Sequence, residues 1–133
     1  MNGSDLNKKT DIALLLLRIG VGVIFIVAGW GKLTGIEGTQ GFFANIGIPM
    51  AGIMAWVVAF VEFVGGIMVL VGAYIRVPAI LLAIVMVVAI LTVKLGGEFS
   101  NMRIDITLLV MCLALFLQGS GGYSVDSALG KGK

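Results

Sequence analysis

Glu62 is the residue in this sequence best placed to do chemistry, because it is the one carboxylate within a long apolar stretch, residues 56–71. A carboxylate near the centre of an apolar helix is costly in a bilayer, so it needs a partner or a function. Arg18 is the most deeply placed charge of an earlier apolar stretch, residues 11–31. A rise of about 1.5 Å per residue puts the two charges at similar depths. The sequence therefore predicts that Arg18 and Glu62 meet as an intramembrane polar site.

Two interpretations of this site stay open at the level of sequence. The pair could be a buried ion pair that only fixes the register of two helices. It could instead bind a lipid headgroup, a quinone carbonyl or a proton, because ionisable groups within a membrane are functional candidates by default.

A second group of charges stands where apolar stretches end, and its members are Lys32, Lys94, Glu98, Arg103 and Asp105. Acids and bases are nearly balanced there, so they could pair within the protein or simply reach toward the membrane surface. The apolar run 106–117 is too short to cross a core of about 30 Å. We therefore expect its helix to begin at or before Arg103, with Asp105 facing inward and paired with Lys32, Lys94 or Arg103.

Four apolar segments must position these charges, at about residues 11–31, 50–72, 77–95 and 101–118. The chain of 133 residues is 59% hydrophobic and only 12% charged, whereas a soluble domain carries roughly 25% charged residues. The sequence thus predicts an all-α membrane protein, a single domain over residues 1–133 that forms a four-transmembrane-helix antiparallel bundle. Asp11 could cap the first helix.

Small residues share a helical face with the central charges. In the first segment, Arg18, Gly22, Gly29 and Lys32 follow a spacing that places them on one face. In the second, Ala55, Ala59, Glu62 and Gly66 do the same. Small residues in membranes let helix backbones approach closely, so we expect these two faces to pack tightly together.

Residues 34–49 join the first two segments and are rich in both glycine and apolar side chains. The apolar residues are Phe42, Phe43, Ile46 and Ile48, too many for a solvated loop. They predict a short element that lies in the membrane interface or folds over the bundle; an ordinary loop anchored by aromatic contacts is the alternative.

The distribution of Lys and Arg gives an orientation. With four spans, five basic residues lie on the side of the termini and three on the other. The more basic side faces the cytoplasm, so we expect a multi-pass plasma-membrane protein with both termini cytoplasmic. Trp30 and Trp56 then lie toward the outer leaflet, and Tyr74 and Tyr123 toward the inner one.

Several classes of site are disfavoured by composition. The chain has no His and a single cysteine, Cys112. Zinc, copper and His-ligated haem sites are therefore not expected, and neither is an intramolecular disulfide. A formal net charge of +2 gives no basic surface for nucleic acid. We expect Cys112 to be a small core residue.

The order of these residues resembles that of the DoxX family of small four-helix membrane proteins. The resembling motifs are residues 18–33 (RIGVGVIFIVAGWGKL), Phe43, Gly47 to Pro49, Glu62 with Gly65 and Gly66, Gly72, Arg76, and residues 119–126 (GSGGYSVD). They cover about residues 14–126. Relatives often carry a His between residues 94 and 105, where this chain has none.

This resemblance implies a fold and suggests a redox connection. The family is named for a small membrane subunit of a quinone-linked oxidoreductase, and other relatives are linked to soluble redox enzymes. One hypothesis is therefore a quinone-linked oxidoreductase subunit with a quinone site and a soluble or membrane-bound redox partner. The others are a non-enzymatic membrane anchor or assembly factor, and a small carrier or lipid-binding protein. The lipid bilayer is the expected surrounding in each case, and a second copy of the chain is a further candidate partner.

Overall fold

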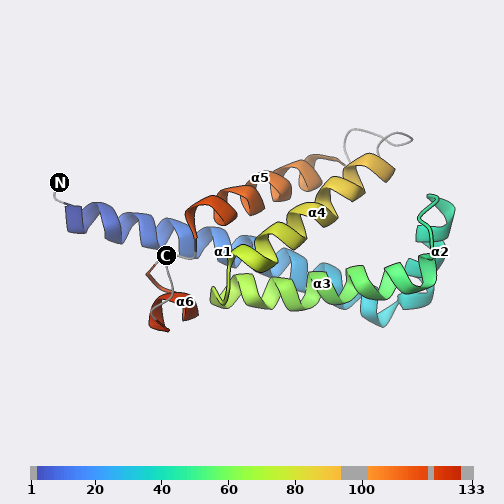
Figure 1. The fold of residues 1–133 in the computed structure, drawn as a ribbon, viewed down its shortest axis with the longest axis horizontal. Helices are drawn as coiled ribbons and strands as arrows, with labels where there is room; N and C mark the ends of the chain where they lie inside the picture. Colours follow the sequence, from blue (N-terminus) through green and yellow to red (C-terminus); the bar gives the residue numbers. More distant parts are fainter. Residues whose placement is uncertain (1–2, 94–101, 120–121, 130–133) are drawn as a thin grey trace.

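The computed structural model describes residues 3–93, 102–119 and 122–129, and every regular element in these ranges is a helix (Figure 1). The elements are α1 (Gly3–Thr34), α2 (Ile36–Asn45), α3 (Ala51–Val71), α4 (Arg76–Val93), α5 (Met102–Gln118) and the short α6 (Val125–Ala128). The four long helices correspond to the four predicted apolar segments.

The long helices pack as two antiparallel pairs. Helix α1 runs the length of the molecule with α3 beside it, and α4 lies beside α5. Contacts between α3 and α4 join the pairs, and α2 packs against the beginning of α3 at the end of the molecule away from α6 (Figure 1). The two antiparallel hairpins bring residues from five helices around a common interior.

Two of these helices are long and apolar enough to cross a membrane, over Lys8–Thr34 and Ala51–Val71. Helices α4 and α5 have 18 and 17 described residues, which correspond to about 27 and 26 Å against a core of about 30 Å. The structure shows how the four long helices pack, but within the described residues only two of them meet the length and composition expected of a membrane span. That all four cross the membrane stays a prediction. The predicted end of the third segment, at residue 95, lies outside the described residues.

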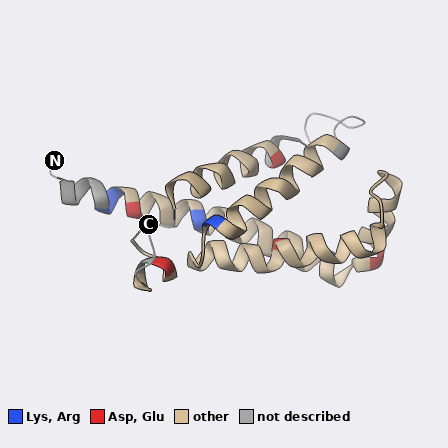
Figure 2. Cartoon of the chain, viewed as in Figure 1, with Lys and Arg blue, Asp and Glu red and all other residues tan. Residues whose placement is uncertain are grey.

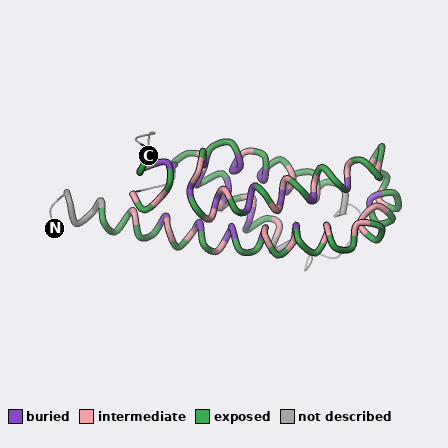
Figure 3. The backbone as a smooth tube through the Cα atoms, turned by 90° about the horizontal axis from the view of Figure 1, so that it is seen from below, coloured by how far each residue is buried: buried purple, intermediate pink, exposed green. Residues whose placement is uncertain are grey.

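The long helices expose large apolar side chains, and they bury two charged ones. Arg18 and Glu62 are only 1% and 2% exposed, whereas the apolar Val27 and Leu117 are 66% and 77% exposed. Figure 2 shows few charged residues along the helices, and Figure 3 shows exposed positions along the outside of every long helix. A surface of this kind fits hydrocarbon, where apolar side chains face lipid and charges face the interior.

Glycines set the distance between α1 and α3. A Cβ on Gly22 would lie 2.8 Å from the carbonyl oxygen of Gly66, and one on Gly29 would lie 2.5 Å from the amide nitrogen of Phe63. Both neighbours are backbone atoms, which cannot move without moving the helix. The prediction that the small-residue faces pack closely is confirmed.

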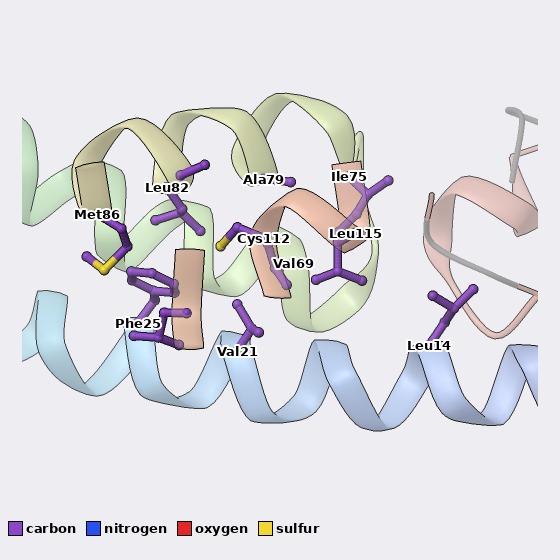
Figure 4. Close-up of a cluster of buried hydrophobic side chains, with 12 residues drawn as sticks. Leu14, Val21, Phe25, Val69, Ile75, Ala79, Leu82, Met86, Cys112 and Leu115 are labelled. Atoms are coloured by element: carbon purple, nitrogen blue, oxygen red, sulfur yellow. The ribbon is translucent and has the colours of Figure 1, made fainter. Parts of the chain in front are cut away.

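The apolar core lies where α1, α3, α4 and α5 meet. Val21, Phe25, Val69 and Leu82 contribute buried side chains from three of these helices, and Cys112 contributes one from α5 (Figure 4). Cys112 is fully buried, so its predicted role as a small core residue is confirmed.

Two predictions about local structure, one for residues 34–49 and one for Asp11, have different outcomes. Residues 36–45 form the helix α2, and Phe43 is buried, so the prediction of a short element folded over the bundle is confirmed and the loop alternative is not. The prediction that Asp11 caps the first helix was wrong, because α1 begins eight residues earlier, at Gly3. The apolar pattern marked where the membrane-compatible part begins, and the helix itself continues through the polar residues before it.

Candidate functional site

The candidate site is a partly open cavity of about 450 Å³ that is lined by residues from five helices. Each wall contributes bulky apolar side chains; examples are Phe25, Phe43, Ile48, Val58, Met86 and Leu108. Against this lining stand three ionisable residues, Lys32 from α1, Glu62 from α3 and Asp105 from α5. A largely apolar cavity with a few convergent polar groups is the usual form of a site for a small molecule.

Lys32 and Glu62 form an ion pair on the cavity wall. The Lys32 Nζ atom donates a hydrogen bond of 3.0 Å to Oε2 of Glu62. The Lys32 side chain is 30% exposed, whereas that of Glu62 is 3% exposed. Lys32 lies in the last turn of α1 and extends inward from the edge of the helix pair, which its long aliphatic stem allows. The pair thus consists of a deeply buried anion and a cation that keeps contact with the surroundings.

Asp105 brings a second carboxylate to the same cavity. It stands in the first turn of α5, which begins at Met102, so the prediction that this helix begins at or before Arg103 is confirmed. Asp105 lines the cavity, as predicted for an inward-facing residue. It also lies close enough to Glu62 for the two carboxylates to interact electrostatically. Its expected pairing with a cation stays a prediction.

The structure brings together only part of the predicted outer charge cluster. Lys32 and Asp105 line one cavity, together with Glu62, which the sequence had assigned to a different site. Lys94 and Glu98 lie outside the described residues, and so does the side chain of Arg103. In the described part of the chain, no three His, Cys, Asp or Glu residues gather as a group that could hold a metal ion.

The predicted pairing of Arg18 with Glu62 was wrong. Arg18 is buried, as expected, but its Nη1 atom donates to the carbonyl oxygen of Leu70 at 3.0 Å, and its Nη2 atom donates to the carbonyl oxygen of Tyr123. The acidic group that interacts electrostatically with it is Asp126. Arg18 and Glu62 thus belong to two separate sites along the contact between α1 and α3.

Arg18 and Glu62 do not pair because of the antiparallel register of α1 and α3. Gly22 faces Gly66, and Glu62 stands one turn before Gly66 on α3. Because the helices run in opposite directions, its neighbours on α1 must lie after Gly22, toward Lys32. Arg18 stands one turn before Gly22 and is therefore carried toward the end of α3. Depths counted from the assumed membrane surfaces missed this direction.

Arg18 belongs to a clasp that holds the C-terminal segment, residues 122–129, against the rest of the protein. The Asp126 carboxylate accepts hydrogen bonds from the amides of Tyr74, at 2.6 Å, and Ile75, at 3.0 Å, just before α4 begins. The Asp126 amide donates to the carbonyl oxygen of Gly72 at 3.0 Å. This carboxylate therefore satisfies amides at the beginning of α4, as a capping residue does, although it lies about 50 residues away in sequence.

Two further contacts complete the clasp. The Asp11 carboxylate accepts a hydrogen bond of 2.8 Å from the amide of Gly122. Gly72 has a φ of +74°, and a Cβ there would lie 2.5 Å from the Cβ of Ser124 and 2.7 Å from Nη1 of Arg18. Sequence reasoning missed the clasp because most of its acceptors and donors are backbone groups, which leave no side-chain pattern. The run GSGGYSVD was the one available signal.

These features define a small helical membrane protein with a largely apolar cavity between its helices, and comparison of sequences places it in a family. The DoxX family model matches residues 13–95, and the chain belongs to the DoxX family. The chain is 41% identical to "Putative oxidoreductase CatD" of Bacillus subtilis, over 96% of this chain and 95% of that protein.

Two other relatives are membrane proteins by name. Inner membrane protein YqjF of Escherichia coli is 35% identical over 95% of this chain and 98% of its own length. Uncharacterized membrane protein Rv3486 of Mycobacterium tuberculosis is 34% identical over 95% of this chain and 86% of its own. No solved structure gives a significant match.

Proposed function

We propose that this protein is a quinone-linked membrane subunit that binds an isoprenoid quinone in the cavity and works with a partner redox protein. The observation that carries the proposal is the cavity itself, in which Lys32, Glu62 and Asp105 face an otherwise apolar space of about 450 Å³. This volume lies within the range of about 300–1,000 Å³ typical of small-molecule sites.

The residues fit the chemistry of such a ligand. A quinone has a flat apolar ring and a hydrocarbon tail, which suit walls made by Phe25, Phe43 and Met86. Its carbonyl oxygens accept hydrogen bonds, and Lys32 has N–H groups beyond the one given to Glu62. When bound, the quinone would accept two electrons and two protons. In this proposal the electrons come from the partner, and the carboxylates of Glu62 and Asp105 exchange the protons.

The comparisons support the class of function and the setting. CatD, which is similar to this chain over nearly its full length, carries the word oxidoreductase in its name. YqjF is named as an inner membrane protein. We extend the proposal to four membrane-crossing helices with both termini in the cytoplasm. The excess of Lys and Arg on the side of the termini supports that orientation.

Quinone content after gentle purification tests the proposal. The protein is extracted from its native membrane in a mild detergent, and the organic extract is quantified for isoprenoid quinones relative to protein. We expect near-stoichiometric quinone in the wild type and a large loss in Ala28→Phe, which fills the cavity. Val27→Phe adds the same ring to a lipid-facing neighbour that is 66% exposed, and it should retain the quinone. Equal quinone in both variants, or none in the wild type, would contradict the proposal.

A second candidate function is a lipid carrier without redox chemistry. It is favoured by the predominantly apolar lining of the cavity, which would also hold another lipid. The same extract distinguishes the two, because a carrier would yield a different lipid at stoichiometric amounts, lost in the same Ala28→Phe variant. An extract with no enriched lipid would favour the non-enzymatic anchor instead.

A further inference from the structure

The Glu62 carboxylate has one oxygen in the ion pair and one open to the cavity. Oε2 accepts the hydrogen bond from Lys32, and no hydrogen bond from any described residue reaches Oε1. Among the described side chains, Nε of Arg18 is the one fully enclosed polar atom that lacks a partner. Oε1 of Glu62 is therefore not sealed by protein atoms, and Glu62 lines the cavity.

An oxygen in this position constrains what can bind beside it. In the ion pair, Glu62 is ionised and can only accept hydrogen bonds. A ligand that fills the apolar cavity would remove water from Oε1, and a buried acceptor without a donor is costly. A well-matched ligand must therefore bring an O–H or N–H group to Glu62. A quinone carbonyl cannot do so, because it is itself an acceptor.

We infer that the cavity prefers the reduced, hydroxyl-bearing form of its ligand, the quinol, with one quinol O–H donated to Oε1 of Glu62. This inference rests on the proposed function and adds the redox form to it. The hydroxyl oxygen of the quinol can at the same time accept a hydrogen bond from the Lys32 ammonium, which stands on the other oxygen of Glu62. One hydroxyl group thus satisfies both members of the pair, whereas a carbonyl satisfies only the cation.

The preference has a measurable size. A hydrogen bond to a charged group contributes more than one between neutral groups, and an unpaired buried acceptor adds its own cost. We expect the quinol to bind about 10- to 100-fold more tightly than the quinone. The Glu62→Gln variant should lose most of this ratio, because its amide offers both a donor and an acceptor.

The test uses the full-length protein in detergent under anaerobic conditions. Dissociation constants are measured for decylubiquinone, for its quinol, and for the dimethyl ether of that quinol, which lacks O–H donors. The wild type should bind the quinol most tightly and the ether weakly. Glu37→Gln, which changes an exposed carboxylate on α2, is the matched control for Glu62→Gln and should keep the wild-type ratio.

The outcomes separate the inference from the function on which it rests. If neither redox form binds, the proposed function fails and the inference fails with it. If both forms bind in the cavity with equal affinity, or the quinone binds more tightly, the function stands and the inference is overturned. The comparison of quinol with its ether in the wild type needs no variant, so the inference stays testable even if Glu62→Gln does not fold.

Discussion

Replacing the two members of the Lys32–Glu62 pair separately should have unequal effects on stability. Met is close in size to both side chains and removes the charge with little change in packing. Lys32→Met leaves the Glu62 carboxylate, 3% exposed, without its counter-charge. The loss of one partner from a buried pair costs about 3–5 kcal/mol. Glu62→Met leaves an ammonium on a side chain that is 30% exposed, and its flexible stem can turn toward the interface. We expect that change to cost less, about 1–2 kcal/mol.

The double variant, which combines Lys32→Met with Glu62→Met, measures how strongly the two charges depend on each other. With both charges replaced, no unpaired ion remains in the interior, so the double change should cost less than the sum of the single changes by about 2–3 kcal/mol. The buried Cys112 supplies the assay, because it is the chain's only cysteine. Its reaction with a maleimide during a titration with a denaturing detergent reports unfolding of the core. Lys9→Met and Glu37→Met, at exposed positions, are the controls. A Glu62→Met variant as unstable as Lys32→Met, or additive effects, would refute the reasoning.

Three further predictions follow from the fold. Gly29→Ala should destabilise the protein by about 2 kcal/mol or more in the same Cys112 titration, because a Cβ there would meet the backbone of α3. Gly31→Ala should be neutral or slightly stabilising, because a Cβ at Gly31 meets nothing within 4 Å. Asp126→Ala should cost about 1–3 kcal/mol and speed proteolysis of the C-terminal segment, because two amides before α4 lose their acceptor; unchanged proteolysis would argue against the clasp. Cysteines placed at positions 8 and 129, in a chain that lacks Cys112, should both react with an impermeant reagent from the cytoplasmic side, and reaction from opposite sides would contradict the proposed topology.

Much of the fold could be predicted from the sequence because it depends on local patterns. Apolar stretches gave the long helices, and the spacing of Gly22, Gly29 and Gly66 gave the face on which α1 and α3 meet. The glycine-punctuated, aromatic-rich segment predicted a short packed element, because it has too many apolar groups to be left in water, and the structure shows that this element is the helix α2. Each of these features follows from the residue types at fixed spacing along one element.

The pairing of charges could not be predicted in the same way. Arg18 and Lys32 lie on one face of α1 with similar chemistry, so the choice between them as partner of Glu62 depended on the register of two helices. The two cations stand 14 positions apart in the sequence, about four helical turns, so the register alone decides which of them lies beside Glu62. The clasp around Asp126 could not be predicted for a different reason. The partners of Asp126 are the backbone groups of Gly72, Tyr74 and Ile75. Every residue carries such groups, so residue type does not reveal them.

Photoaffinity labelling tests the central claim, that the cavity binds a quinone-type ligand, most directly. A short-chain quinone with a photoreactive azide is added to the protein in lipid nanodiscs, and the modified residues are identified by mass spectrometry. The labels should fall on cavity-lining residues such as Phe43, Val58 and Met86, and both excess quinone and Ala28→Phe should suppress them. Labels spread over lipid-facing residues such as Val27 and Leu117, and unchanged by competitor, would contradict the claim.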